Sequence, residues 1–320
     1  MLTKTWSIRS LAAMFPLLLL ASGAWAASPA RKRAPAPAVS KPAPAVAHAI
    51  PVALTRYPGE LPLDVKEEGT EQRKGVTVRD VTFAGLSATD RMRAYVVTPP
   101  GRGPFAGVLY VHWLGEPATT NRTQFLDDAV VLASQGVVSV LVDAMWSKPG
   151  WYAQRTHETD YERSVEQVQR LRRALDLLVA QPGVDEKRLG FVGHDFGAMY
   201  GALMGAVDQR PRAYVLMTAN PRFSTWYLLG RRQPKDRAAY LKQMEVLDVT
   251  RYLPLLSPAP LFFQFASNDR YVSAKEAQEL YAAAKEPRLI RRYPTDHGLD
   301  VKRGAQDRFQ WLVRHLKLRR

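Results

Sequence analysis

The sequence predicts an α/β fold with about eight mostly parallel strands and helices on both faces of the sheet. Strand-like apolar runs alternate with helix-like segments along most of the 320 residues, and the links between them are short. Several runs, such as "FAGVLYVHW" and "VVSVLVDA", are apolar throughout, as expected for strands that a parallel sheet buries on both faces. With 46% hydrophobic residues, the chain can form one large core.

The expected elements follow one another in a regular order. The eight predicted strands occupy residues 75–83, 91–99, 105–113, 137–144, 188–194, 212–219, 259–266 and 288–294. Helices are predicted over residues 121–136 and 158–181, because apolar residues in the second segment recur at intervals of three and four. Two more are expected after Asp195, where small residues dominate, and at the end of the chain around Leu312.

The first 52 residues do not belong to this domain. Residues 1–26 combine two basic residues, a short apolar run and the small-x-small sequence Ala24-Trp25-Ala26, the pattern of a secretory signal peptide. Residues 27–52 are rich in Pro and Ala, a composition that cannot bury enough surface to fold and indicates a disordered linker. The predicted α/β domain covers residues 53–320, and the protein is expected to be periplasmic or secreted.

The amino-acid composition limits which catalytic groups, metals and partners can be expected. The chain has no cysteine, which excludes thiol catalysis and Cys-ligated zinc, and no motif predicts a metal or a cofactor. The formal net charge of +15 would favour weak association with anionic envelope surfaces, or simply give a solvated basic surface. A nucleic-acid partner is not expected for an exported chain without a nucleic-acid-binding motif. The sequence makes no prediction of the oligomeric state.

The segment "FVGHDFGAMYG" has the spacing of a nucleophile elbow, with Asp195 in the central position. A sharp strand-to-helix turn strains its central residue and leaves no room for side chains two positions away. Gly193 and Gly197 meet that requirement. Because the elbow would lie at the carboxyl end of a strand, where sites in such sheets occur, Asp195 is the first candidate catalytic residue.

Two further candidates follow strands later in the chain. Asp269 occurs in "SNDRYV" and His297 in "TDHGL", each directly after a predicted strand. Nucleophile, acid and histidine in this order match the order of a hydrolase triad. Asp269 would accept the Nδ1 proton of His297 and stabilise the imidazolium when it forms. Either residue alone could instead be an ordinary turn or surface residue.

These motifs resemble the α/β-hydrolase superfamily, and on the scale of the whole domain its dienelactone-hydrolase-like branch. The resemblance covers roughly residues 75–318 and depends on "VLYVHWLGE", "VDEKRLGFVGHDFGA", "FQFASNDRYV" and "YPTDHGL". It implies that Asp195 is the nucleophile, Asp269 the acid and His297 the base. The backbone N–H groups of Phe196 and Leu114 would be the oxyanion donors. The sequence departs from the family at Trp113, where most members have glycine.

The elbow itself resembles a different branch. "GHDFG" is similar to the elbow of epoxide hydrolases and haloalkane dehalogenases, in which a carboxylate attacks saturated carbon and histidine activates water. The segment from Asn220 to Pro254 has room for a small lid. Trp226 and Tyr227 in this lid, together with Trp113, are expected to line a pocket for a small-molecule substrate.

Three interpretations of Asp195 therefore remain. It is a covalent nucleophile, or a general base on water in an ester or lactone hydrolase, or part of a catalytically silent binding protein of the cell envelope.

The mature chain is predicted to begin near Ala27. N-terminal sequencing of the exported protein tests this, and recovery of Met1 would show that the signal is not removed.

Overall fold

The computed structural model of the protein describes residues 49–115, 121–230 and 233–318. The predicted signal peptide and the predicted linker up to residue 48 lie outside the described residues. The first described helix is α1 (Val52–Thr55). Leu54 in α1 is fully buried, and Ile50 packs against the same core. Packing therefore begins a few residues before the predicted domain boundary at residue 53.

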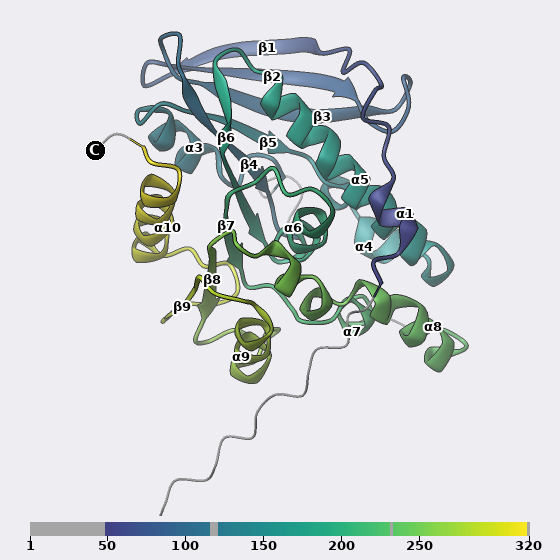
Figure 1. Ribbon diagram of the computed structural model, residues 1–320. Helices are drawn as coiled ribbons and strands as arrows, with labels where there is room; N and C mark the ends of the chain where they lie inside the picture. Colours follow the sequence, from purple (N-terminus) through teal and green to yellow (C-terminus); the bar gives the residue numbers. More distant parts are fainter. Residues whose placement is uncertain (1–48, 116–120, 231–232, 319–320) are drawn as a thin grey trace, which may run out of the picture. The chain divides into compact units, whose positions relative to one another are not determined.

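A single mixed sheet forms the centre of the domain (Figure 1). Its nine strands lie in the order β1-β2-β3-β5-β4-β6-β7-β8-β9. Strands β1, β2, β3 and β5 pair antiparallel, and the other neighbours pair parallel. The strands are β1 (Lys66–Arg73), β2 (Val76–Ala84), β3 (Arg91–Thr98), β4 (Phe105–Val111), β5 (Val137–Val142), β6 (Val184–His194), β7 (Ala213–Met217), β8 (Leu261–Ala266) and β9 (Arg288–Tyr293).

The sequence predicted eight of these strands and missed β1. This edge strand reads KEEGTEQR, and every residue in it is exposed. Strands are predicted from the alternation of apolar and polar residues, and β1 has no apolar residue to alternate. Its charges fit an edge position, where they discourage pairing with another chain.

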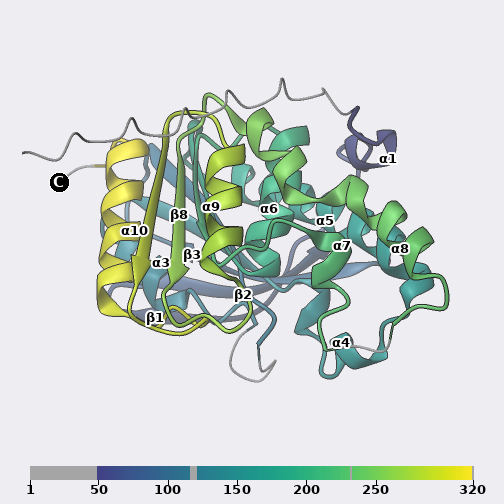
Figure 2. The same ribbon diagram turned by 90° about the horizontal axis from the view of Figure 1, so that it is seen from below.

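Helices cover both faces of the sheet, as predicted (Figure 2). Successive residues of β4 contribute to opposite clusters: Leu109 belongs to the cluster that includes residues of α5, α6 and α9, whereas Val108 belongs to the cluster that includes residues of α3 and α10. Among the described residues, no helix is long and apolar enough to cross a membrane. The helices after α1 are α3 (Leu126–Ala133), α4 (Trp151–Gln154), α5 (Asp160–Val179), α6 (Phe196–Val207), α7 (Phe223–Trp226), α8 (Arg237–Met244), α9 (Ala274–Ala283) and α10 (Lys302–His315). Short 3₁₀ turns occupy Met145–Ser147, His157–Thr159, Glu245–Leu247, Val249–Arg251 and Leu253–Leu256.

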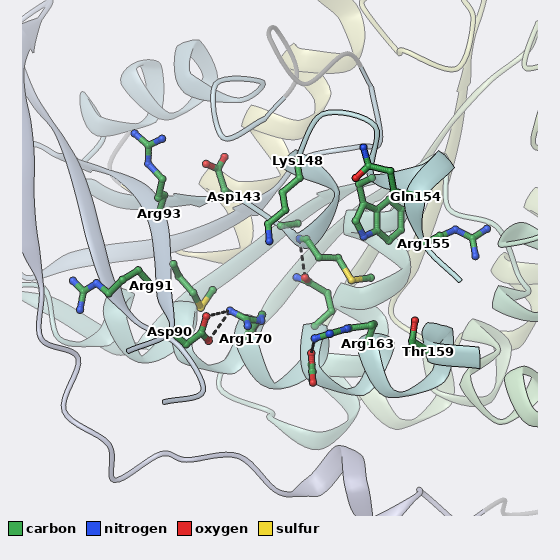
Figure 3. Close-up of a pocket in the computed structure, with 16 residues that line it drawn as sticks. Asp90, Arg91, Arg93, Asp143, Lys148, Gln154, Arg155, Thr159, Arg163 and Arg170 are labelled. Carbon is green, nitrogen blue, oxygen red and sulfur yellow. Dashed lines mark hydrogen bonds and ion pairs between the residues drawn. The ribbon is translucent and has the colours of Figure 1, made fainter. Parts of the chain in front are cut away.

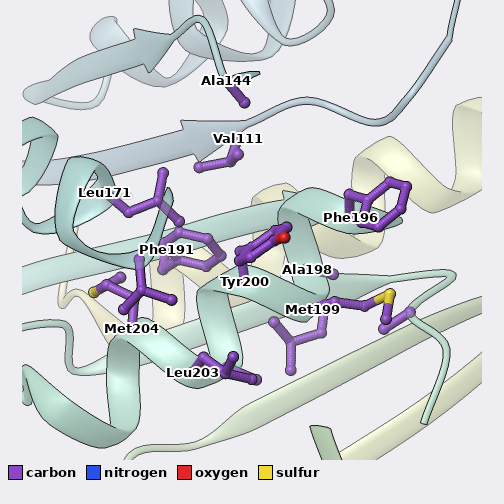
Figure 4. Packing of buried hydrophobic residues seen from close by; sticks show 14 of the residues in the cluster. Val111, Ala144, Leu171, Phe191, Phe196, Ala198, Met199, Tyr200, Leu203 and Met204 are labelled. Atoms are coloured by element: carbon purple, nitrogen blue, oxygen red, sulfur yellow. The ribbon is translucent and has the colours of Figure 1, made fainter. Parts of the chain in front are cut away.

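Helix α6 packs against the sheet with side chains that belong to a buried hydrophobic cluster (Figure 4). It lies close to the strands because several of its glycines face them. A Cβ atom added at Gly201 would lie 2.0 Å from Cε1 of Phe191, and one at Gly205 would lie 2.5 Å from the hydroxyl of Tyr214. Every residue from Phe196 to Ala206 is buried. The small residues noted in the sequence thus fix the depth at which the helix, and the turn that precedes it, sit against the sheet.

Replacing Gly201 by alanine should destabilise the protein by roughly 1–3 kcal/mol. Although alanine has the higher helix propensity, the new methyl group must displace the buried Phe191 ring, and overpacking a core has this cost. Urea unfolding measures the change. Gly69→Ala is the matched control, because a Cβ there meets nothing within 4 Å. Equal stability of the two variants would contradict the close packing of α6.

Candidate active site

The elbow positions Asp195 at the carboxyl end of β6. Its backbone angles are φ 53° and ψ −119°, a strained conformation for a residue with a side chain. The turn is held by hydrogen bonds from Asp195 N to the Met217 carbonyl (2.8 Å) and from Met199 N to the Asp195 carbonyl (2.9 Å). A Cβ atom at Gly193 would lie 2.5 Å from the Gly197 carbonyl oxygen, and one at Gly197 would lie 2.2 Å from that of Val111. Both elbow positions therefore require glycine.

The Asp195 carboxylate is buried and surrounded by donors. Leu114 N donates to Oδ2 at 3.2 Å, and Trp226 Nε1 donates to Oδ1 at 3.0 Å. Burial raises the pKa of Asp195 to about 6, and the nearby His297, these two hydrogen bonds and the backbone N–H of Phe196 reduce the effect. Of the two N–H groups that the sequence predicted as oxyanion donors, that of Leu114 thus donates to the carboxylate of Asp195 itself.

His297 and Asp269 form a hydrogen-bonded pair. Nδ1 of His297 lies 2.8 Å from Oδ2 of Asp269, while Oδ1 accepts hydrogen bonds from Tyr271 N (2.8 Å) and Val272 N (3.0 Å). Burial opposes a charge on either group, but their mutual interaction outweighs it, so the pKa of Asp269 is lowered and the pKa of His297 is raised. The charge of Asp195 also raises the pKa of His297.

One cavity has two of the three candidate residues in its lining, and the third, Asp269, is hydrogen-bonded to one of them. It has a volume of about 360 Å³, and both Asp195 and His297 line it. Asp195 and His297 interact through their charges, and no hydrogen bond between their described side chains is found. Nδ1 of His297 is used by Asp269, which leaves Nε2 for a proton transfer. The other lining residues are Trp113, Leu114, Tyr152, Phe196, Trp226, Leu229, Gly230 and Tyr271.

The structure corrects one predicted pocket residue. Trp226 lines the cavity, but Tyr227 is fully buried and does not. The Tyr227 hydroxyl lies 3.1 Å from Oγ of Ser164 and is also hydrogen-bonded to Tyr200. Consecutive residues at the end of a helix point in different directions, since each residue is rotated by about 100°. The sequence did not single out Tyr271 as a wall residue; its position two residues after Asp269 was the available signal.

A buried chain of hydrogen bonds joins the loop of the predicted oxyanion donor to the loop of His297. Trp113 N donates to Oε1 of Gln124 (2.9 Å), and Nε2 of Gln124 donates to Nδ1 of His194 (2.6 Å). Nε2 of His194 then donates to the backbone carbonyl of His297 (2.9 Å). Burial holds the pKa of His194 well below its usual value, so this imidazole is neutral and has a fixed tautomer. No signal in the sequence pointed to Gln124, which lies on an unremarkable polar stretch.

The domain is similar to solved structures of hydrolases. No family model matches the sequence, and no curated protein matches it. Acetyl xylan esterase 1 from Thermoanaerobacterium sp. JW/SL YS485 superposes with a TM-score of 0.66, at 14% identity over 82% of this chain and 91% of that chain. The chain has the α/β-hydrolase fold.

Other α/β hydrolases give the same result. An acetyl xylan esterase from Paenibacillus sp. R4 matches with a TM-score of 0.67, at 16% identity over 82% of this chain and 92% of that one. An S-formylglutathione hydrolase from Agrobacterium tumefaciens matches with a TM-score of 0.58, at 15% identity over 78% and 99%. Within the part of the chain described, no group of three or more His, Asp or Glu side chains is arranged to hold a metal ion.

Asp195→Asn should change how stability depends on pH. The folded-state pKa of about 6 lies above the ordinary aspartate value of 3.8, so in the wild type this group stabilises the fold fully below pH 4 and loses that contribution as pH rises to 6. The loss amounts to about 3 kcal/mol, at 1.36 kcal/mol per pKa unit. Relative to the wild type, the Asn variant should therefore gain about this much between pH 4 and pH 7. Urea unfolding across this range measures it, and parallel curves would contradict the buried carboxylate.

Proposed function

We propose that the protein is an exported hydrolase of a small organic substrate, in which Asp195 is a covalent nucleophile toward saturated carbon. The observation that supports this is the hydrogen bond that Leu114 N–H donates to the Asp195 carboxylate, next to which the N–H of Phe196 also favours the negative charge. Donors in these positions stabilise negative charge on whichever oxygen they bind. Here that oxygen belongs to Asp195, so they are suited to an intermediate formed on Asp195.

The first step forms an ester between Asp195 and the substrate. Trp226 Nε1 gives up its hydrogen bond to Oδ1 of Asp195. Oδ1 then attacks a substrate carbon that carries a halide or belongs to an epoxide. The bond from that carbon to the halide or to the epoxide oxygen breaks. A carboxylate suits this step because it has no proton to lose. An epoxide oxygen needs a proton as it leaves, and Tyr271, which lines the cavity and is 53% exposed, is the available phenol. A departing halide ion needs no proton.

The second step hydrolyses that ester. Water attacks the carbonyl carbon of the Asp195 ester and gives its proton to Nε2 of His297, while the oxyanion on Oδ2 is held by Leu114 N–H and Phe196 N–H. Collapse of this intermediate passes the proton from Nε2 of His297 to the departing alkoxide and leaves Asp195 as the carboxylic acid. The acid then releases the second water proton, to solvent after displacement of a halide or to the Tyr271 phenolate after opening of an epoxide, and the carboxylate is restored. Forming the ester also removes the Asp195 charge that raises the pKa of His297. The imidazole therefore becomes a neutral base at the stage that requires one.

The second candidate is ester or lactone hydrolysis, with Asp195 as general base on water. The dienelactone-hydrolase-like resemblance favours it, and two of the similar solved structures are acetyl xylan esterases. An ester substrate, however, must place its own carbonyl oxygen against the oxyanion donors, and in this site Asp195 already engages them. The covalent mechanism needs no such exchange, because the Leu114 N–H already donates to the carboxylate on which the intermediate would form.

The proposal also covers where the protein acts and why it is not a catalytically silent binding protein. The N-terminal signal pattern supports export. The net charge of +15 supports weak association with anionic envelope surfaces. A protein that only binds its ligand would not need the His297–Asp269 pair at 2.8 Å beside a carboxylate with a pKa of about 6.

His297→Gln should stop the cycle at the ester. Without a base to activate water, the Asp195 ester accumulates, and intact-mass spectrometry should show the protein carrying the substrate's alkyl group. A panel of epoxides and haloalkanes supplies the substrates, with aryl esters and lactones for the second candidate. The matched control is Asp195→Ala combined with His297→Gln, which should give no adduct.

Isotope labelling separates the two catalytic candidates. In a single turnover of the wild type in H₂¹⁸O, the covalent mechanism puts label into Asp195 and leaves the first product unlabelled. Direct labelling of the product, without label in the peptide that contains Asp195, would reject the nucleophile and support the general base. No turnover of any substrate class, unchanged in Asp195→Ala, would support the silent fold.

A further inference from the structure

Two loops of the catalytic cavity are connected by a short row of side chains that lies behind it. One loop follows β4 and carries Leu114, whose N–H donates to the catalytic carboxylate. The other follows β9 and carries His297. Gln124 and His194 connect the two loops. Their hydrogen bonds measure 2.9, 2.6 and 2.9 Å and run from Trp113 N to the His297 carbonyl oxygen.

The two backbone ends of this row determine the direction of every hydrogen bond in it. Trp113 N–H can only donate, so it faces Oε1 of Gln124, and the amide turns its NH₂ group toward His194. An NH₂ group also only donates, so Nδ1 of His194 has no proton. The single proton is therefore on Nε2, which donates it to the carbonyl oxygen of His297. A second proton on His194 would point at the NH₂ group of Gln124, so the row holds a neutral imidazole in one tautomer.

The rings around the row are packed closely together. His194 is fully buried, and the ring of Trp113 stacks on it, with centroids 5.1 Å apart and an angle of 4° between the planes. The rings of Trp113 and His194 each lie 5.8 Å from the ring of His297. Trp113, at which the sequence departs from the family it resembles, thus provides both the first donor and one wall of the row.

The segment that carries Gln124 is itself anchored to the sheet. Arg122, two residues earlier, is 7% exposed and pairs with Asp143 (2.6 Å), directly after β5, and with Asp80 (2.8 Å) in β2. Its backbone N–H also donates to Asp143 (3.0 Å). Asp143 lines a separate cavity of about 580 Å³ between β3, α4 and α5 (Figure 3). The amide of Gln124 is therefore held relative to the sheet as well as to the two loops.

We propose that Gln124 and His194 are positioning residues, which hold the Leu114 N–H and His297 in fixed positions relative to Asp195. Neither residue of the row lines the catalytic cavity, so both act through the loops and not on the substrate. An intermediate on Asp195 needs the donor and the base in place together, because one holds its oxyanion while the other transfers its protons. The reaction that the row would serve rests on the proposed function, whereas the hydrogen bonds of the row do not.

NMR titration of the Asp195 carboxylate tests the assignment without a substrate, with Asp195→Asn identifying the signal. Gln124→Met removes the amide at nearly the same size, so Trp113 N–H loses its acceptor and the loop with the Leu114 N–H is released. The pKa of Asp195 should then rise by about one above its value of about 6, because the carboxylate loses a hydrogen bond that favours its charged form.

Gln124→Glu provides a conservative rescue with a signature of its own. Its carboxylate still accepts from Trp113 N–H, so the pKa of Asp195 should stay closer to the wild-type value than in Gln124→Met. It presents an acceptor to Nδ1 of His194, however, which should take up a second proton. The pKa of His194, which burial holds well below its usual value in the wild type, should therefore rise. Wild-type His194 should be neutral near pH 7 and protonated on Nε2 only.

Gln181→Met is the matched control. Gln181 is also a buried glutamine with both ends of its amide hydrogen-bonded, but it precedes β6, whereas Asp195 follows that strand. An unchanged pKa of Asp195 in folded Gln124→Met, or the same rise in Gln181→Met, would overturn the proposal. So would a wild-type His194 protonated on Nδ1, a result that does not require any variant to fold. Failure of the proposed reaction would show separately, as no adduct in His297→Gln while these pKa differences remain.

Discussion

The candidate active site depends on the buried carboxylate of Asp195, which lies on a turn that requires glycine at two positions. Burial raises the pKa of Asp195 to about 6, and the charge of His297 together with the hydrogen bonds from Leu114 N and Trp226 Nε1 limits the rise. These two donors come from separate segments, the loop after strand β4 and helix α7, while Asp195 itself lies on the elbow. The charge of Asp195 therefore fixes the relative positions of these segments, in addition to any part it takes in the reaction.

The elbow connects this electrostatic requirement to the packing of the core. Gly193 and Gly197 allow backbone atoms to approach within distances that a Cβ would obstruct, and Gly201 and Gly205 continue the same approach along α6. The helix can therefore begin directly beneath the carboxylate, with its first N–H group directed at it. The depth of α6 in the core and the geometry of the predicted oxyanion donors are thus set by the same row of glycines.

Much of this arrangement follows from local sequence, and the remainder depends on tertiary contacts. Apolar runs located the buried strands, because strands such as β4 are apolar on both faces. Asp195, Asp269 and His297 could be identified as candidates because each directly follows a predicted strand. The same reasoning missed β1, which has no apolar pattern, and misplaced Tyr227, whose direction depends on helix rotation. Gln124 could not be identified from the sequence. An isolated glutamine gives no periodic signal, and its importance lies entirely in which buried donors and acceptors the fold brings to it.

The row of glycines also constrains how such a protein can change over evolutionary time. The positions two residues before and after residue 195 are sterically closed to any side chain, whereas Asp195 itself lines a cavity. A substitution at this one position would change the group that the elbow presents to the cavity while the strand, the helix and the backbone donors stayed in place. The scaffold thus separates the residues that preserve the turn from the single residue that decides the chemistry. Two hydrolases with different reactions could therefore differ very little in their architecture.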